Sequence, residues 1–212
     1  MKPKVIIFDL DGVLVDSSEL VSDYFMHSYP TMTHEIMDEI LRGNFHERLE
    51  KFKTSNAPRS ETPEEKEARS KAYTVQKLTT PLFPGIKKLL ESLNEEGFIL
   101  MVNTSAFERN SVPVLEYANV KDLFDFIATA EVSKNKTEKF NMILEKYAIT
   151  ADESVFVTDT VGDIIEAQKA GIQTIAVTWG AHSAEHFNRE PFDNLIAIVD
   201  SIEELESKIK NK

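Results

Sequence analysis

The sequence contains no cysteine, only one tryptophan and only seven glycines among its 212 residues. The absence of cysteine excludes thiol nucleophiles, cysteine-ligated zinc, iron–sulfur clusters and disulfides. No apolar run approaches the ~18 residues that a membrane span requires. The apolar stretch after Lys4 is interrupted at Asp9, which is too soon for a signal peptide. We therefore expect a cytoplasmic protein that has no membrane partner.

Basic residues are in short supply as well: 24 Lys and Arg stand against 36 Asp and Glu, which gives a formal net charge of −12. Such a charge repels nucleic acids and anionic membranes, so neither is expected as the main partner. The length suits one domain with a sizeable insertion, or two small domains. We expect a monomer or a weak homodimer.

Six short apolar runs are typical of strands that are buried on both faces of a parallel sheet. They lie at Val5–Phe8, Phe98–Val102, Phe126–Ala128, Val155–Thr158, Thr174–Val177 and Ile196–Val199. Segments with helical spacing of apolar residues separate them, such as the one that ends at Gly97. This alternation predicts an α/β fold with a doubly wound parallel sheet.

One long stretch, from about Asp16 to Thr80, has no strand pattern and is dominated by helical patterns. These cover Leu20–Tyr29, His34–Arg42 and Thr62–Lys77. The many charges of the third segment predict a solvated face. We interpret residues 16–80 as an all-helical insertion, and residues 1–15 and 81–212 as the two parts of the α/β core.

Two carboxylates follow the first predicted strand. Asp9 and Asp11 are two residues apart, so in extended chain their side chains point to the same side. Gly12 then permits a sharp turn. Ligands of open α/β sheets bind at the carboxyl ends of the strands, where this pair is expected. An ordinary acidic loop is the alternative.

A second acidic pair follows the fourth predicted strand: Asp159 stands at its end and Asp163 four residues later. Asp163 could simply favour the positive end of a helix. Carboxylates that converge on one site repel each other and need a cation. With no thiolates available, these hard oxygen ligands favour Mg²⁺, with Mn²⁺ and Ca²⁺ as alternatives, so we predict a Mg²⁺ site among Asp9, Asp11, Asp159 and Asp163.

These motifs resemble those of the haloacid dehalogenase (HAD) superfamily, in its phosphatase and phosphomutase branch. Asp9-Leu10-Asp11-Gly12-Val13 resembles the first motif. Thr104, Lys136 and the pair Asp159 and Asp163 resemble the second, third and fourth motifs, in the correct order. The insertion resembles the helical cap of the subfamily that includes phosphoglycolate phosphatases and β-phosphoglucomutases. The resemblance implies a HAD-like Rossmannoid core with this cap above it.

The resemblance and the chemistry together imply roles for these residues. Asp9 is the expected nucleophile, which forms an aspartyl-phosphate, and Asp11 is the expected general acid and base. Thr104 and Lys136 are expected to bind the phosphoryl group, with Ser105 and Lys134 as alternatives to them. The metal would offset the repulsion between an anionic nucleophile and an anionic phosphate.

The segment around Gly43 combines a possible hinge with Arg42, His46 and Arg48, three side chains that could contact an anion. Related caps place a substrate-specificity loop at about this position, while an ordinary interhelical turn is the alternative. We therefore regard Arg42, His46 and Arg48 as candidate substrate-binding residues.

The sequence thus predicts a Mg²⁺-dependent phosphatase that acts on a small phosphorylated metabolite. The nearest alternative is a phosphomutase similar to β-phosphoglucomutase, which a dependence of activity on a bisphosphate would reveal. A non-catalytic metabolite-binding regulator on the same fold is another alternative, against which the intact pair Asp9 and Asp11 argues. A dehalogenase is disfavoured, because Asp11 supplies the leaving-group acid that phosphoryl transfer needs.

Overall fold

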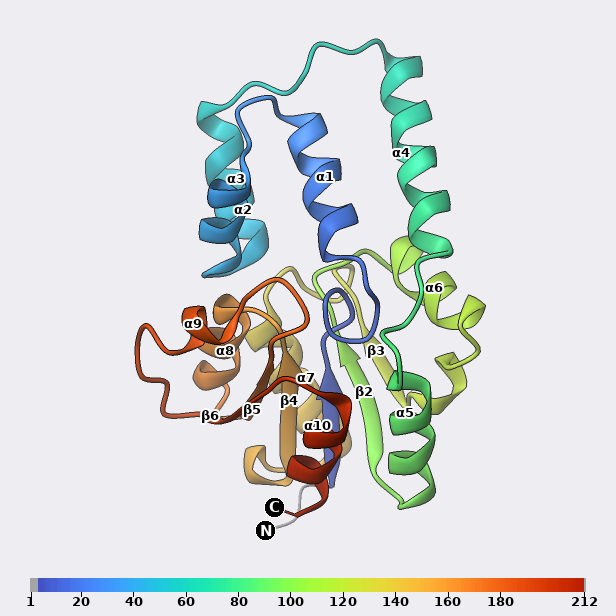
Figure 1. The fold of residues 1–212 in the computed structure, drawn as a ribbon, viewed down its shortest axis with the longest axis vertical. Coiled ribbons are helices and arrows are strands. Elements are labelled where there is room, and N and C mark those ends of the chain that lie inside the picture. Colours follow the sequence, from blue (N-terminus) through green and yellow to red (C-terminus); the bar gives the residue numbers. More distant parts are fainter. Residues whose placement is uncertain (1–3, 212) are drawn as a thin grey trace.

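The computed structural model describes residues 4–211, and its core is a six-stranded sheet in which every paired strand runs parallel to its neighbour (Figure 1). The strands lie in the order β3-β2-β1-β4-β5-β6. Their bounds are β1 Val5–Phe8, β2 Ile99–Asn103, β3 Phe126–Ala128, β4 Ser154–Thr158, β5 Gln173–Val177 and β6 Leu195–Val199. The predicted doubly wound α/β fold is confirmed, with a strand at each of the six apolar runs.

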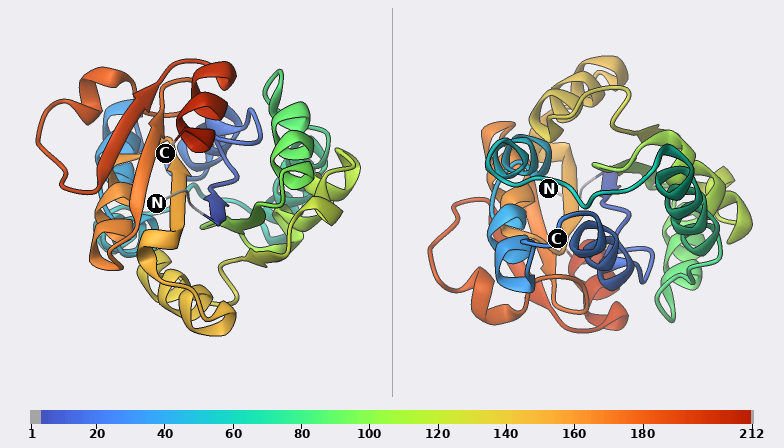
Figure 2. Two further views of the ribbon diagram at one scale, coloured as in Figure 1. Left: turned by 90° about the horizontal axis from the view of Figure 1, so that it is seen from below. Right: turned by 90° about the horizontal axis from the view of Figure 1, so that it is seen from above.

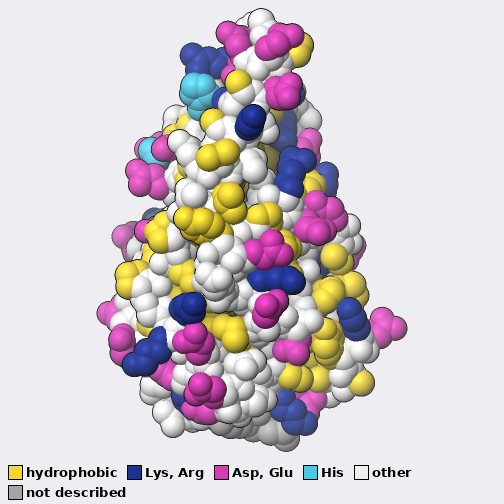
Figure 3. All heavy atoms as spheres, turned by 90° about the vertical axis from the view of Figure 1, so that its right-hand side faces the viewer, with side chains coloured by type: hydrophobic (Ala, Val, Ile, Leu, Met, Phe, Trp, Pro, Cys, Tyr) yellow, Lys and Arg dark blue, Asp and Glu magenta, His cyan; other side chains and the backbone are white. Residues whose placement is uncertain are grey.

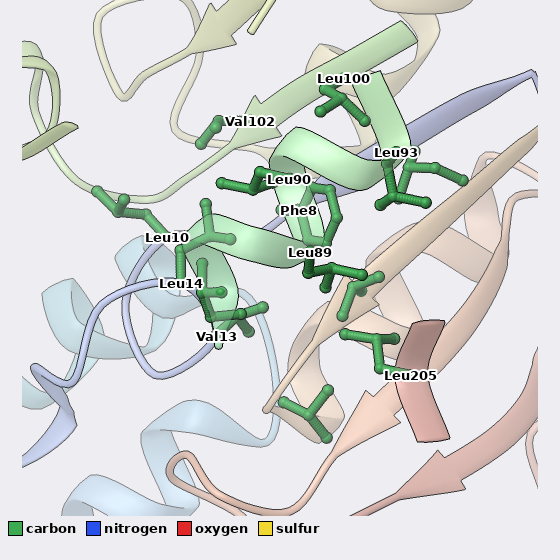
Figure 4. Packing of buried hydrophobic residues seen from close by; sticks show 14 of the residues in the cluster. Phe8, Leu10, Val13, Leu14, Leu89, Leu90, Leu93, Leu100, Val102 and Leu205 are labelled. Carbon is green, nitrogen blue, oxygen red and sulfur yellow. The ribbon is translucent and has the colours of Figure 1, made fainter. Parts of the chain in front are cut away.

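Helices cover both faces of the sheet (Figure 2). The core helices are α5 Ile86–Glu95, α6 Val112–Tyr117, α7 Lys136–Tyr147, α8 Val161–Lys169, α9 Ala184–Phe187 and α10 Ile202–Lys210. Side chains alternate along β1, so that Ile6 and Phe8 pack with α5, α6 and α10, whereas Val5 and Ile7 pack with α7 and α8. Figure 4 shows the packing of buried residues of the first of these two clusters, among them Phe8, Leu90 and Leu205.

Four helices form a cap above the carboxyl ends of the strands (Figure 1). They are α1 Ser18–Ser28, α2 His34–Leu41, α3 Phe45–Ser55 and α4 Pro63–Leu78. Helices α1, α2 and α4 match the three predicted helical segments, but α3 begins in the segment around Gly43, for which a loop or an interhelical turn was predicted. Asn44 starts this helix, because its side chain accepts a hydrogen bond from the Glu47 N–H at 2.9 Å.

The two connections between cap and core lie side by side, since Val15 and Leu82 form an antiparallel bridge. The division into a core of residues 1–15 and 81–212 and an insertion of residues 16–80 stays a prediction. Among residues 4–211, no helix has the length and apolar character needed to cross a bilayer. On the face that includes α4 and α6, acidic and basic side chains are interspersed (Figure 3).

The cap rests directly on the core. The side chain of Asn44 donates to Glu166 Oε1 at 2.8 Å, and His46 Nε2 lies 3.0 Å from the backbone oxygen of Ser105. Asp38 Oδ1 lies 3.3 Å from His182 Nε2 and 3.0 Å from His186 Nε2, and the two imidazole rings are stacked. The structure therefore describes the cap in a closed position.

Candidate active site

The candidate site lies at the point where the strand order changes direction, between β1 and β4. Asp9 directly follows β1, Thr104 follows β2 and Asp159 follows β4. All three line one cavity of 340 Å³ between cap and core. Asp11, Ser105, Lys136 and Asp163 line the same cavity. This is the position at which open α/β sheets bind ligands.

Lys136 joins two of the predicted carboxylates. It is the first residue of α7, whose N-terminus is capped by Asn135. Its Nζ lies 2.8 Å from Asp9 Oδ2 and 2.6 Å from Asp163 Oδ2. Although burial opposes ionisation, the carboxylates of Asp163 and Asp9 raise the pKa of Lys136 above its usual value. The ammonium group of Lys136 therefore stays charged at the floor of the cavity.

Asp9 and Asp159 are buried carboxylates. Burial, together with the nearby carboxylates of Asp163 and Asp159, raises the pKa of Asp9 to about 8 against the attraction of Lys136. Burial also raises the pKa of Asp159 to about 7, although the backbone N–H of Ala181 donates to Asp159 Oδ2 at 2.8 Å. Additional positive charge at this place would favour the ionised form of both groups.

The carboxylate of Asp11 has two partners that the sequence analysis did not identify. Asp11 Oδ1 forms an ion pair with Lys77 Nζ and accepts a hydrogen bond from the Ser17 hydroxyl. Lys77 lies at the end of α4 in the cap and is fully buried. The expectation that the charges of residues 62–77 form only a solvated face is therefore wrong for Lys77. Burial lowers the pKa of this lysine to about 7.

The groups around Asp159 leave room and an unpaired oxygen for a cation. Asp159 Oδ1 is buried and has no hydrogen-bond partner within the described structure. A Cβ atom added at Gly12 or at Gly180 would meet Asp159 Oδ2 at 1.9 Å or 2.3 Å, so both glycines leave room for the carboxylate. Mg²⁺ commonly takes one or two protein carboxylates, and its other ligands are water and phosphate oxygens. The pair Asp9 and Asp159 fits such a site.

The four predicted metal-binding carboxylates are not equivalent. Residues 4–211 contain no group of three or more His, Asp or Glu side chains arranged to hold a metal ion. Asp163 Oδ2 contacts Lys136 and also accepts from the Thr158 hydroxyl at 2.7 Å, while the Asp11 side chain pairs with Lys77. The side chains of Asp163 and Asp11 therefore already have cationic partners, unlike the free Asp159 Oδ1.

The predicted substrate-binding residues divide into two groups. Thr104, Ser105, His46 and the alternative lysine, Lys134, line the cavity. Arg42 and Arg48 are not among the residues that line it. One guanidinium nitrogen of Arg42 lies 3.8 Å from Glu190, and Arg48 donates to the backbone oxygen of Glu39. The structure therefore directs both arginines away from the position expected for a substrate anion.

Two further residues, which were not predicted, contact backbone atoms of the site residues. Glu166 Oε1 accepts from the Lys136 backbone N–H at 2.8 Å and from the side chain of Asn44 in the cap. Lys139 is buried, and its Nζ donates to the backbone oxygen of Thr104. Both contacts join residues that are far apart in the sequence, so no local pattern signals them.

A doubly wound sheet, a helical cap and carboxylates at the strand ends together define a capped α/β protein with a ligand cavity at the strand ends. A family model described as haloacid dehalogenase-like hydrolase matches residues 6–177. The chain belongs to this family. The predicted membership in the phosphatase branch of the HAD superfamily is confirmed, and with it the prediction of a phosphatase.

Individual relatives and a solved structure are similar to this chain. Phosphoglycolate phosphatase of Vibrio cholerae is 28% identical, over 89% of this chain and 90% of the relative. Pyrophosphatase PpaX of Oceanobacillus iheyensis is 24% identical, over 95% and 96%. The crystal structure of a predicted phosphatase from Clostridium acetobutylicum has a TM-score of 0.76 and 24% identity, with full coverage of both chains.

Proposed function

We propose that the protein is a Mg²⁺-dependent phosphatase that hydrolyses a small phosphorylated metabolite through an aspartyl-phosphate on Asp9. One observation carries the proposal: Asp9, Asp11, Thr104 and Lys136 line one cavity at the strand ends, and Lys136 contacts Asp9 directly. A nucleophile, a proton donor, a hydrogen-bond donor and a cation are the groups that phosphoryl transfer requires.

In the first step an oxygen of Asp9 attacks phosphorus, and the bond from phosphorus to the leaving oxygen breaks. Asp9 is held for this attack by two contacts, the Leu10 N–H at 2.7 Å on Oδ1 and Lys136 at 2.8 Å on Oδ2. The carboxylic acid form of Asp11 gives its proton to the leaving oxygen, so the product departs as a neutral alcohol.

In the second step a water molecule attacks the phosphorus of the aspartyl-phosphate. Asp11 takes the proton from this water, the bond between phosphorus and Asp9 breaks, and inorganic phosphate leaves. The Thr104 hydroxyl donates a hydrogen bond to the phosphoryl oxygens, and Lys136 adds positive charge beside them. Lys139 supports Thr104, because its ammonium group contacts the backbone oxygen of that residue.

Asp9 and Asp159 would hold the metal, with Asp159 Oδ1 as the free oxygen, and the backbone oxygen of Asp11 as a further ligand in this family. When bound, Mg²⁺ supplies positive charge that offsets the repulsion between the carboxylates and a phosphate dianion. Asp163 would act indirectly, since its carboxylate fixes the position of the Lys136 ammonium group.

The proposal is tested with a panel of phosphate esters in the presence of Mg²⁺, measuring released phosphate for wild type and for Asp9→Asn. We expect wild type to hydrolyse at least some esters, and Asp9→Asn to lose at least about 1,000-fold in kcat, as other nucleophile substitutions do. Asp122→Asn is the matched control, because the Asp122 side chain is 98% exposed. Equal and negligible hydrolysis by all three proteins contradicts the proposal.

The covalent step has a separate test. Wild type mixed with phosphate-labelled substrate and quenched in acid should carry label on the peptide that contains Asp9, whereas Asp9→Asn should carry none. Label on another peptide, or none in a wild-type enzyme that turns over, contradicts the aspartyl-phosphate route. Turnover that requires an added bisphosphate would identify a phosphomutase instead.

A further inference from the structure

The roof of the cavity is built from six aromatic rings that contact one another in a continuous series. In order they are Tyr73, Tyr24, Phe25, Phe45, His46 and Phe107, which we call the aromatic arc. Successive ring centroids are 4.4, 5.5, 5.6, 5.5 and 6.2 Å apart. All six residues line the cavity that also contains Asp9 and Lys136. The arc is therefore part of the same site as the proposed nucleophile.

The arc is assembled from several parts of the chain. Helices α1, α3 and α4 of the cap contribute five rings, and the loop after β2 in the core contributes Phe107. Closing the cap completes the arc, since the interaction between His46 and Phe107 joins the cap rings to the core ring. The surface that the arc offers consequently exists as a whole only while the cap covers the site.

Core packing does not account for the arc. Phe25 and Phe45 also pack against the buried cluster of the cap, but Tyr24, Tyr73 and Phe107 belong to none of the hydrophobic clusters found in residues 4–211. None of the six rings is fully buried. Partly exposed aromatic rings that face a ligand cavity provide stacking and edge-to-face contacts to a bound ring.

Of the polar side chains that line the cavity, three already use a polar atom in a contact within the protein. His46 Nε2 lies 3.0 Å from the Ser105 backbone oxygen, and Lys53 forms an ion pair of 2.8 Å with Glu50. Asn110 accepts a hydrogen bond from the Thr74 hydroxyl. Fewer polar groups are thus available for a leaving group with many hydroxyls than the lining alone suggests, whereas the ring faces remain available.

We propose that the substrate is a phosphate monoester whose leaving alcohol carries an aromatic ring, which packs against the aromatic arc while the phosphoryl group lies at Asp9. This inference rests on the proposed phosphatase function. The cavity of 340 Å³ is near the lower end of ligand cavities, about 300–1,000 Å³. A phosphoryl group with one ring system fits this range, and a dinucleotide is too large for it.

The test compares kcat/KM for esters of primary alcohols, so that the leaving groups have similar chemistry. Benzyl phosphate and 2-phenylethyl phosphate are the aromatic probes, cyclohexylmethyl phosphate is the apolar probe without an aromatic ring, and glycerol 3-phosphate and glucose 6-phosphate are the polar probes. We expect at least about a tenfold preference for the aromatic over the polar esters, with the cyclohexyl ester between them. Equal or better hydrolysis of the polar esters overturns the inference.

Substitutions in the aromatic arc test whether its rings cause the preference for aromatic esters. Tyr73→Leu removes a ring from the cap, and Phe107→Leu removes one from the core, so the two variants do not share a risk of misfolding. Each should lower kcat/KM for benzyl phosphate about threefold to tenfold more than kcat/KM for glycerol 3-phosphate, the effect of one aromatic contact. Tyr117→Leu is the matched control, because Tyr117 is 61% exposed and outside the cavity.

The outcomes separate the inference from the proposed function. Equal losses with both kinds of ester would show that the rings act only through the structure of the site, which overturns the inference. Hydrolysis of polar esters in preference to aromatic ones overturns the inference and leaves the phosphatase function intact. Hydrolysis of no ester at all, by wild type with Mg²⁺, overturns the proposed function itself.

Discussion

Replacement of Gly162 by alanine tests whether the closed cap is the active arrangement. Gly162 lies in the first turn of α8, where the backbone of the cap approaches very closely. A Cβ atom at this position would lie 2.3 Å from the backbone oxygen of Gly43, 2.6 Å from its nitrogen and 2.7 Å from the backbone oxygen of Leu41. Ordinary contacts need about 3.5 Å, so Gly162→Ala requires the cap to move by about 1 Å.

A movement of this size acts on the site through the cap–core contacts. The hydrogen bonds from Asn44 to Glu166, at 2.8 Å, and between His46 and Ser105, at 3.0 Å, would lengthen beyond useful range. A misplacement of about 1 Å can cost about 100-fold in rate. We therefore expect Gly162→Ala to lower kcat/KM by about 10-fold to 100-fold.

The effect of Gly162→Ala on stability should be small. Alanine favours a helix by about 1 kcal/mol over glycine, and the cap can open to avoid the new methyl group. The loss of the two cap–core hydrogen bonds opposes this gain by about 1 kcal/mol each, so the free energy of unfolding, measured by urea denaturation, should change by no more than about 1–2 kcal/mol. A large loss of activity with little change in stability would indicate that the cap can no longer close over the core.

Gly171→Ala is the matched control. Gly171 has a φ of 73°, and its added Cβ would meet nothing closer than 3.6 Å. This substitution should cost about 1–2 kcal/mol of stability through the left-handed backbone and leave kcat/KM unchanged. If Gly162→Ala retains full kcat/KM, the cap does not approach the core this closely during turnover, and the reasoning from the closed structure fails.

Three further predictions concern the floor of the site. Treatment with a chelator should abolish phosphate release and added Mg²⁺ should restore it; activity that persists after complete metal removal contradicts the proposed metal site. Lys136→Met leaves Asp9 and Asp163 buried without their cation, so the free energy of unfolding in urea should fall by about 3–5 kcal/mol. Lys134 is exposed, so Lys134→Met should change this free energy by less than about 0.5 kcal/mol. Equal effects of the two substitutions would refute the assigned roles. Gly12→Ala should abolish Mg²⁺-dependent activity, because its Cβ would overlap the Asp159 carboxylate, and near-normal activity would contradict the assignment of Asp159 to the metal.

The strands of this protein were predictable because parallel strands are buried on both faces. The central strand Val5–Phe8 is completely buried, and the sequence of such a strand is an uninterrupted apolar run. The strand ends then locate Asp9, Thr104 and Asp159 without any knowledge of long-range contacts. The part of the site that lies directly at strand ends therefore follows from local sequence.

Helix α3 was missed because its apolar stripe is narrow. Only Phe45, Leu49 and Phe52 face the cap interior, and charged residues occupy most other positions. Their spacing and the cap residue Asn44 were nevertheless visible in the sequence. A loop around Gly43 would allow Arg42, His46 and Arg48 all to reach a substrate, whereas with α3 starting at Phe45 only His46 of these three lines the cavity.

The contact between Lys77 and Asp11 could not be predicted from sequence, because it depends on how the cap docks onto the core. Lysine in a charged helix is normally solvated. Lys77 is buried only because the end of α4 returns to the core beside the loop that contains Asp11. The same holds for Glu166, which joins Asn44 of the cap to the Lys136 backbone.

These buried contacts explain how a protein with a net charge of −12 can receive an anionic substrate. Lys77, Lys136 and Lys139 are all almost fully buried, and each contacts a residue at the floor of the cavity. Interactions between buried charges are screened far less than interactions with the mixed acidic and basic surface. Of the three, Lys136 has a raised pKa and stays charged, so it and a cation at the proposed site of Asp9 and Asp159 would set the local field at the phosphoryl position, and the acidic surface would contribute little to it.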